Sequence, residues 1–202
     1  IGDTLVRFAN GMVYVFFVLV ITQFYEVRFD ATVALAGASY AIDLSPAAFF
    51  GYLLGVEMLV ALATMMPAAK LAERVGLKPV VGLGFLVYGA FPVVLIYGPE
   101  LLAPAMSLQW ALVLLFAFSG LRFAGLPSHK ALIVGPAEQD AGGRVTGTYY
   151  LLRNTVVIPS AALGGYLWQF VNPELAFTIA AAIGVAGTGY FLAFGQEFDA
   201  YR

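Results

Sequence analysis

The chain lacks cysteine altogether and carries a single histidine among its 202 residues. The absence of cysteine excludes disulfides, thiol nucleophiles and thiolate metal ligands. The lone histidine has no second histidine with which it could form the ligand spacing of a metal centre. The sequence therefore predicts no metal site, no cofactor and no catalytic residues, and we expect the protein not to be an enzyme.

Charged residues are scarce as well. They make up 11% of the sequence, whereas an ordinary soluble domain carries about 25%. Hydrophobic residues make up 61%, and the mean hydropathy is +0.89. A soluble fold of this length could not hide so much apolar surface in one core, but a lipid bilayer can solvate it. We expect an integral protein of the plasma membrane, with the lipid bilayer as a partner and no nucleic acid.

Long apolar runs define the organisation of the chain. A spanning helix needs about 20 mainly apolar residues, and the runs do not alternate as the strands of a membrane barrel would. The sequence predicts an all-α membrane protein, a single domain over 1–202 formed by a six-helix transmembrane bundle. The predicted helices cover 5–24, 46–69, 79–97, 105–134, 145–170 and 174–194.

Basic residues in the connections predict the orientation. Cytoplasmic loops are enriched in Lys and Arg, and the connections 70–78 and 135–144 hold most of the basic residues between the runs. We therefore expect these two loops and both termini to be cytoplasmic. The connection 25–45 becomes an external loop. Its apolar stretch 33–40 is too short to span, so we expect an interfacial or partly packed turn of helix there.

Polar side chains inside the bilayer gather on the first, second, fourth and fifth runs, mostly at spacings of three and four that place them on one helical face. The third and sixth runs offer little besides Gly, Ala and bulky apolar residues. We expect the first group to surround a polar interior and the other two runs to face lipid. The residues expected to contact a substrate or to couple protons are Asn10, Tyr14, Glu57, Arg122, Arg153 and Asn154.

Glu57 is the sharpest candidate because it lies near the middle of the second run. A charge at the centre of a spanning helix costs about 2.5–3.5 kcal/mol on insertion scales, so it should face a cavity or a partner. One interpretation is proton coupling, since burial and neighbouring charges can tune a carboxyl to exchange protons near neutral pH. The other is a structural ion pair with Arg122, which also lies near a helix midpoint. The sequence does not choose between them.

The two arginines and the histidine each have two interpretations. Arg122 and Arg153 could bind an anionic group, or they could neutralise Glu57 or extend toward the cytoplasmic interface. We favour the second for Arg153, and we expect His129 to be an interface residue. The pattern Gly51-Tyr52-Leu53-Leu54-Gly55 is a GxxxG motif, which predicts close packing against a neighbouring helix.

The segment between the second and third runs resembles the signature loop of the major facilitator superfamily (MFS), G-x-x-x-D-R-x-G-R-K. It reads Ala69-x-x-x-Glu73-Arg74-x-Gly76-Leu77-Lys78, with Ala69, Glu73 and Leu77 departing from the pattern. Such a degenerate form is similar to that of the second half of family members. The resemblance implies that Glu73, Arg74, Gly76 and Lys78 form a conformational latch loop, although for Lys78 we favour the interpretation that it is only a topology anchor.

A second resemblance to the same family covers 125–168. Family members often show a Pro before an Ala-Leu-Ile run, a polar loop ending in Gly-Arg, a Tyr-Leu-Leu-Arg-Asn opening, and a Pro before Gly-Gly. The matching residues are Pro127, Ala131-Leu132-Ile133, Gly143-Arg144, Tyr150-Leu151-Leu152-Arg153-Asn154, Pro159 and Gly164-Gly165. The resemblance implies helices 7 to 12 of a twelve-helix transporter.

The expected function is therefore secondary active transport of a small solute by alternating access, as a permease or efflux protein, with protons as a candidate coupling ion. Six helices would form half of the usual cavity, so we expect either a missing N-terminal six-helix half or a second copy as partner. The lack of an initiator Met favours the first. The alternatives are a six-helix channel or scaffold subunit and, less favoured, a membrane-embedded enzyme using His129 or Glu57.

Overall fold

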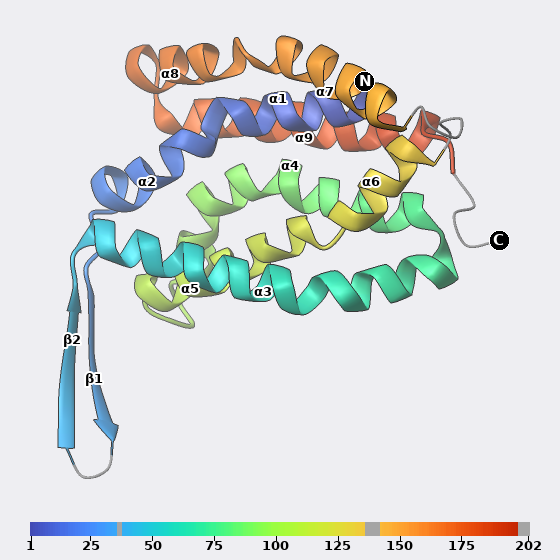
Figure 1. The fold of residues 1–202 in the computed structure, drawn as a ribbon. Helices are drawn as coiled ribbons and strands as arrows, with labels where there is room; N and C mark the ends of the chain where they lie inside the picture. The colour runs from blue at the N-terminus through green and yellow to red at the C-terminus, as the bar shows by residue number, and fades with distance from the viewer. Residues whose placement is uncertain (36–37, 136–141, 198–202) are drawn as a thin grey trace.

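The computed structural model describes residues 1–35, 38–135 and 142–197, which are mostly helical. Within these ranges, five helical segments are long and apolar enough to cross a membrane: Gly2–Phe24, Pro46–Val75, Leu77–Leu102, Leu108–Val134 and Pro173–Phe194. The helices run alongside one another in two layers (Figure 1). The first comprises α1 (Gly2–Val13), α7 (Gly142–Val157), α8 (Ser160–Phe170) and α9 (Pro173–Phe194). The second comprises α3 (Pro46–Val75), α4 (Leu77–Leu102), α5 (Leu108–Gly120) and α6 (Leu126–Val134).

Polar residues start two of the long helices. Ser45 caps α3, its hydroxyl accepting from the Ala48 amide at 3.4 Å, and Pro46 occupies the first turn. Asn172 caps α9 in the same way, accepting from the Leu175 amide at 2.6 Å, with Pro173 following it. A side-chain oxygen satisfies one of the free N–H groups of a helix start, and proline lacks the N–H that would be left free. These local signals fix where both spans begin.

The predicted helix 145–170 is interrupted. It consists of α7 and α8, which meet at Ile158 and Pro159, and neither is long enough to span alone. Proline has no N–H for the helical ladder and its ring clashes with the preceding turn. The six-helix count is therefore not reached by uninterrupted helices in the described part of the chain.

The predicted cytoplasmic loop 70–78 is a second correction. Helix α3 continues to Val75 and α4 begins at Leu77, so only Gly76 separates them. Most residues of this segment, its Lys, Leu, Ala, Glu and Arg, are good helix formers. Gly76 has φ +94°, a conformation that side chains with a Cβ rarely adopt, which lets the chain reverse within one residue. Of the predicted loop 135–144, residues 136–141 lie outside the described residues, and Gly142 already begins α7.

The predicted external connection forms strands, whereas we expected a turn of helix there. Phe29–Leu35 (β1) and Ala38–Leu44 (β2) form an antiparallel hairpin that projects from one end of the bundle (Figure 1). The exposed side chains of Arg28 and Asp43 join the base of the two strands at 3.2 Å. Pairing of the two strands satisfies backbone groups that one short helical turn would leave open. The N-terminus and the α3–α4 turn lie at the opposite end of the bundle (Figure 1).

The core is built around the third predicted run, which the sequence had placed against lipid. In α4, 67% of the residues in the apolar window are buried, the highest share among the candidate spans. Phe91 of α4 contacts Phe17 and Phe116 edge to face, with ring centroids 5.4 and 5.7 Å apart. A Cβ on Gly89 would lie 2.6 Å from the backbone of Gly184, so α4 and α9 cross at contact distance. The expectation that α4 faces lipid is wrong because glycine lets a neighbouring backbone cover it.

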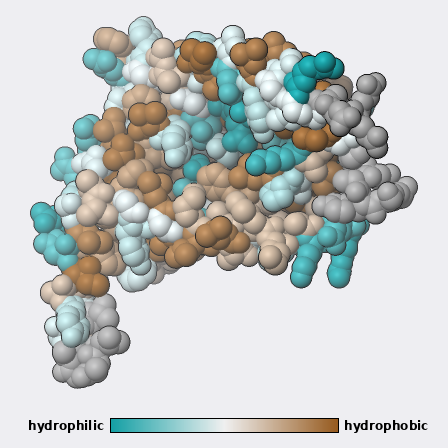
Figure 2. Space-filling model, in the orientation of Figure 1, coloured by the Kyte–Doolittle hydropathy of each residue, from teal (hydrophilic) through white to brown (hydrophobic). Residues whose placement is uncertain are grey.

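The GxxxG motif of α3 behaves differently. A Cβ on Gly51 or Gly55 would meet no atom within 4 Å among the described residues, so the expected close packing is not found there. Large apolar side chains on the same helix are also exposed, including Leu59, Leu62 and Met66. Figure 2 shows apolar surface over much of one face, with hydrophilic residues at the ends and between the two layers. Such a surface is that of a membrane protein.

Candidate functional site

A buried ion pair lies between α3 and the segment that follows α5. Nη2 of Arg122 lies 2.8 Å from Oε1 of Glu57, and the Ser119 hydroxyl donates to the same oxygen. Glu57 is 1% exposed and Arg122 is 3% exposed. The structure thus brings together the two charged residues that the sequence placed at helix midpoints. Whether the pair also couples protons remains a prediction.

Local structure explains how the pair is positioned. Helix α5 ends at Gly120, and Leu121–Phe123 form a 3-10 turn (η3) that carries Arg122. A Cβ on Gly120 would lie 2.6 Å from the Glu57 carbonyl oxygen, so only glycine lets α5 approach α3 at this level. Pro127 in the first turn of α6 then restarts the helix. The close approach and the 3-10 turn together direct the guanidinium onto Glu57.

Aromatic rings surround the guanidinium of Arg122. Its central carbon lies 4.8–5.9 Å from five ring centroids, those of Tyr14, Phe17, Tyr88, Phe91 and Phe123. A cation over an aromatic face gains about 2 kcal/mol when it is desolvated. Nε and Nη1 of Arg122 are nevertheless buried without a hydrogen-bond partner among the described residues. Of the predicted site residues, Tyr14 therefore belongs with Glu57 and Arg122.

A second cluster, which we call the Asp3 cluster, lies near the start of α1. Asp3 is 7% exposed, and its carboxylate lies 3.3 Å from Arg7, 3.4 Å from Arg153 and 3.6 Å from His129. The Tyr149 hydroxyl donates to the same carboxylate. The cluster joins α1, α6 and α7, and it borders a pocket of about 230 Å³.

The sequence analysis missed Asp3. An acidic residue in the first turn of a helix is common because it interacts favourably with the helix dipole, so Asp3 gave no functional signal. His129 was expected at an interface and is buried instead. Arg153 belongs to this cluster and also donates to Oδ1 of Asn154, at 3.1 Å from Nε and 2.9 Å from Nη2. Asn10 is half-buried and makes no side-chain hydrogen bond within the described ranges.

The predicted latch residues divide into two groups. Glu73 and Arg74 are exposed, and neither forms an ion pair with another described residue. At Gly76 the turn is held instead by Glu197, whose carboxylate accepts from the backbone amides of Leu77 at 2.8 Å and Lys78 at 3.0 Å. A carboxylate at a helix start neutralises free N–H groups and the helix dipole. No motif pointed to Glu197, which lies more than a hundred positions from Leu77 and Lys78 in the chain.

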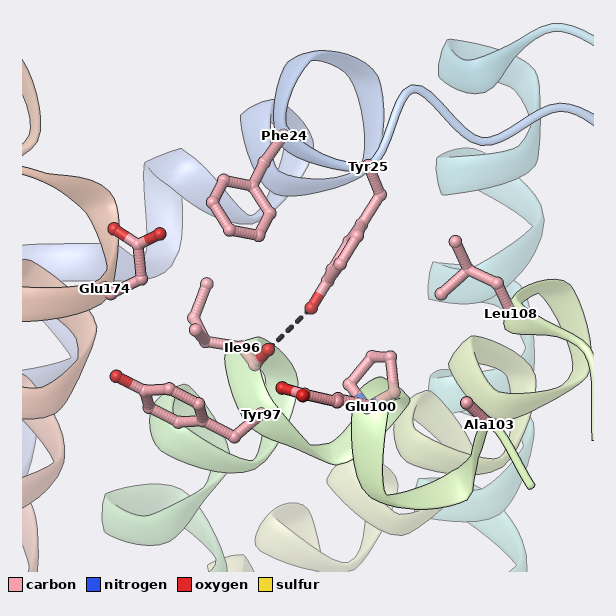
Figure 3. Close-up of a pocket in the computed structure, with 9 residues that line it drawn as sticks. Phe24, Tyr25, Ile96, Tyr97, Glu100, Ala103, Leu108 and Glu174 are labelled. Atoms are coloured by element: carbon pink, nitrogen blue, oxygen red, sulfur yellow. Dashed lines mark hydrogen bonds between the residues drawn. The ribbon is translucent and has the colours of Figure 1, made fainter. Parts of the chain in front are cut away.

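A further pocket of about 380 Å³ lies at the hairpin end of the bundle, between the end of the first span, α4 and α9. Figure 3 shows the carboxylates of Glu100 and Glu174 beside the rings of Tyr97, Phe24 and Tyr25. The Tyr25 hydroxyl donates to the Ile96 carbonyl oxygen at 2.6 Å. Burial, together with Glu100 and Glu174, raises the pKa of Tyr25 to about 12. This phenol therefore stays protonated at neutral pH.

Three helical interruptions lie close together in the bundle. Tyr14–Phe16 form a 3-10 turn (η1) in the first span, and Tyr14 lies beside Arg122 in η3. The break between α7 and α8 lies beside the first span, because a Cβ on Gly11 would be 3.3 Å from Val157. Interruptions inside spanning helices are tolerated where the backbone lines a cavity or is covered by protein.

No group of three His, Cys, Asp or Glu side chains suited to a metal ion occurs in the ranges that the structure describes. The chain is similar to an uncharacterized MFS-type transporter of Methanocaldococcus jannaschii, with 26% identity over 121 residues. The aligned region is 59% of this chain and 28% of that protein, so the chain spans only part of its relative. This likeness supports the MFS resemblance of the sequence. No family model matches the chain.

Proposed function

We propose that this chain is the C-terminal six-helix half of an MFS transporter, with helices 7 to 12, which moves a small solute across the plasma membrane by alternating access. The observation that carries the proposal is the coincidence of the buried Glu57–Arg122 pair with interrupted helices at the same level. Many secondary transporters bind substrate and coupling ions near the midplane, beside discontinuous helices. The name of the archaeal relative supports the same function.

In this proposal α7 and α8 cross the membrane together as one broken span, and both termini face the cytoplasm. The solute cavity lies on the side of the bundle where the polar residues Tyr14 and Asn154 are exposed. Tyr14 is 50% exposed and Asn154 is exposed, although each neighbours a buried charged cluster. These two residues are the parts of the predicted site that a solute can reach.

The open faces of α3 and α7 are the contact surface for the other half of the transporter. Helix α7 contains no buried residue, and Leu151 and Leu152 are 68% and 65% exposed. The glycines at 51 and 55 of α3 can admit a close helix, as GxxxG motifs do. An N-terminal six-helix half or a second copy of this chain would cover these faces.

Proton coupling follows from the chemistry of the pair. The ionised Glu57 carboxylate holds Arg122, and binding of a proton to Glu57 would remove that attraction and leave the guanidinium free to move. Such a change biases one of two global states, as alternating access requires. The short turn at Gly76 would transmit the movement between α3 and α4, with Glu73 and Arg74 acting as the latch in one state.

Flux into liposomes tests this function. The complete protein is reconstituted, candidate solutes are added against a pH gradient, and internal pH is followed with a trapped dye. We expect saturable, solute-dependent proton flux, which Glu57→Gln abolishes and the exposed control Glu26→Gln leaves intact. Glu73→Ala should slow turnover without abolishing it, and wild-type turnover would refute the latch.

The alternatives predict other results. Flux that does not saturate with solute would indicate a channel, and no flux with any solute would leave a scaffold. Gradient-driven transport that is unchanged in Glu57→Gln would refute the coupling role while leaving the transporter in place.

A further inference from the structure

A small internal cavity lies between α1, α4, η3 and α6, next to the Glu57–Arg122 pair. Its volume is about 10 Å³, close to the room that one water-sized molecule needs. The polar groups of its wall belong to Arg7, Tyr88, Arg122 and His129, and apolar residues such as Phe85 and Leu126 complete it. The wall contains no acidic side chain among the described residues.

The cations of this wall have unused donors. Nε and Nη1 of Arg122 are buried and have no hydrogen-bond partner in the described part of the chain. Leaving a buried donor unpaired is destabilising, and more so when the group is charged. The guanidiniums of Arg7 and Arg122 also lie 4.8 and 5.0 Å from the same Tyr88 ring, so two like charges flank one side chain. Both features favour an acceptor of negative charge in the cavity.

The balance of charge points the same way. In the cavity wall, the Asp3 cluster and the Glu57–Arg122 pair, three arginines face two carboxylates, Asp3 and Glu57, with His129 in addition. Neither carboxylate lines the cavity: Glu57 is paired with Arg122, and Asp3 lies within 4 Å of Arg7, Arg153 and His129. The phenols that belong to this region are those of Tyr14, Tyr88 and Tyr149. An uncompensated cation inside the bundle is costly unless an anion accompanies it.

His129 provides access. It lines the small cavity and also the pocket of about 230 Å³ beside Asp3 and Tyr149, so both spaces border the same imidazole. Rotation of this side chain would connect them. The residue that the sequence assigned to an interface therefore lies where an entering ion must pass.

We propose that this cavity is a binding site for a small monovalent anion, which accepts hydrogen bonds from Nε and Nη1 of Arg122 and is held between Arg7 and Arg122. The shared chemistry is that of a halide or of one oxygen of a small carboxylate. The site does not depend on transport, and a binding measurement tests it separately. Because a halide is somewhat larger than water, Phe85 and Leu126 must give way slightly.

The test is thermal unfolding of the purified protein in detergent, with sodium bromide replacing sodium gluconate at constant ionic strength. We expect a saturable rise in melting temperature, of about 3 °C at ten times the dissociation constant. Arg122→Lys keeps a cation beside Glu57 but lacks Nε and Nη1. It should weaken bromide binding at least tenfold, because a hydrogen bond to a charged group contributes about 1.5–3 kcal/mol. Arg74→Lys, the same change at an exposed position, should bind bromide as the wild type does.

Equal melting curves in bromide and gluconate, or an unchanged bromide response in Arg122→Lys, would overturn the site. Should Arg122→Lys fail to fold, Arg7→Met removes the other guanidinium of the wall and should also lower bromide affinity. A parallel measurement in sodium formate distinguishes a free halide from a carboxylate group as the ligand. Stabilisation by bromide assigns the site to a free halide, and stabilisation by formate alone assigns it to a carboxylate group such as a solute carries. His129→Ala should speed bromide release without removing its binding.

Discussion

The two buried carboxylates of this protein, Glu57 and Asp3, are held in opposite ways. Glu57 has one cation and one hydroxyl as partners, and aromatic rings surround the cation. Asp3 has two arginines, a histidine and a tyrosine hydroxyl, and it borders an open pocket. These partners are those found within residues 1–35, 38–135 and 142–197.

The two carboxylates differ in the number of their partners and in their access to water. Loss of one partner at Asp3 leaves several others, and water from the pocket can replace the missing contact. At Glu57 the loss of Arg122 leaves a charge in a low-dielectric interior, where it costs far more. We infer that the Asp3 cluster braces three helices through redundant contacts, whereas Glu57 depends mainly on a single cation, Arg122.

The largest expected effect is that of Glu57→Gln. It removes the charge that compensates Arg122 and should lower the free energy of unfolding by about 3–5 kcal/mol. Thermal unfolding in detergent measures the loss. The double variant Glu57→Gln/Arg122→Met should recover much of it, because no isolated charge remains. A loss below about 1 kcal/mol in the single variant would mean that water reaches the pair, and the contrast with Asp3 would disappear.

Ser119→Ala should have an intermediate effect. It removes a hydroxyl that donates to the buried carboxylate, and hydrogen bonds to charged groups contribute about 1.5–3 kcal/mol. The control is Thr64→Ala on α3, whose hydroxyl donates to carbonyl oxygens of its own helix, that of Val60 at 2.7 Å and that of Ala61 at 3.2 Å. The same unfolding assay should show little change for this control. An equal loss in the two variants would contradict a special role for the Ser119 hydroxyl.

The smallest expected effect is that of Arg153→Gln in the Asp3 cluster. Asp3 keeps Arg7 and the Tyr149 hydroxyl, and Arg153 is partly exposed, so the free energy of unfolding should fall by less than about 1 kcal/mol. Arg122→Gln, the same substitution at the other carboxylate, should cost several times more. Similar losses at the two arginines would show that the two clusters are held alike.

Parts of the site could be predicted from the sequence because the free-energy cost of a charged side chain in the bilayer depends on its own position in an apolar run. A Glu and an Arg near the midpoints of apolar runs need partners of opposite charge, and Glu57 and Arg122 form an ion pair with each other. Asp3 could not be singled out in this way, because an acidic residue at a helix start is common. Glu197 gave none either, because its partners Leu77 and Lys78 lie more than a hundred positions earlier in the chain. Contacts between segments so distant depend on the way the helices cross.

Composition and apolar run length alone determined that this is a helical membrane protein, since every backbone polar group in lipid must be satisfied within a helix or a closed sheet. Proline and the capping residues determined the α7–α8 break and the starts of α3 and α9. Only the tertiary structure decided that α4 is central, that Gly89 and Gly184 rather than Gly51 and Gly55 bring backbones together, and that Phe29–Leu35 pairs with Ala38–Leu44. The reason is that several faces of an apolar helix are equally acceptable to lipid, so hydropathy cannot choose the face that a neighbour will cover.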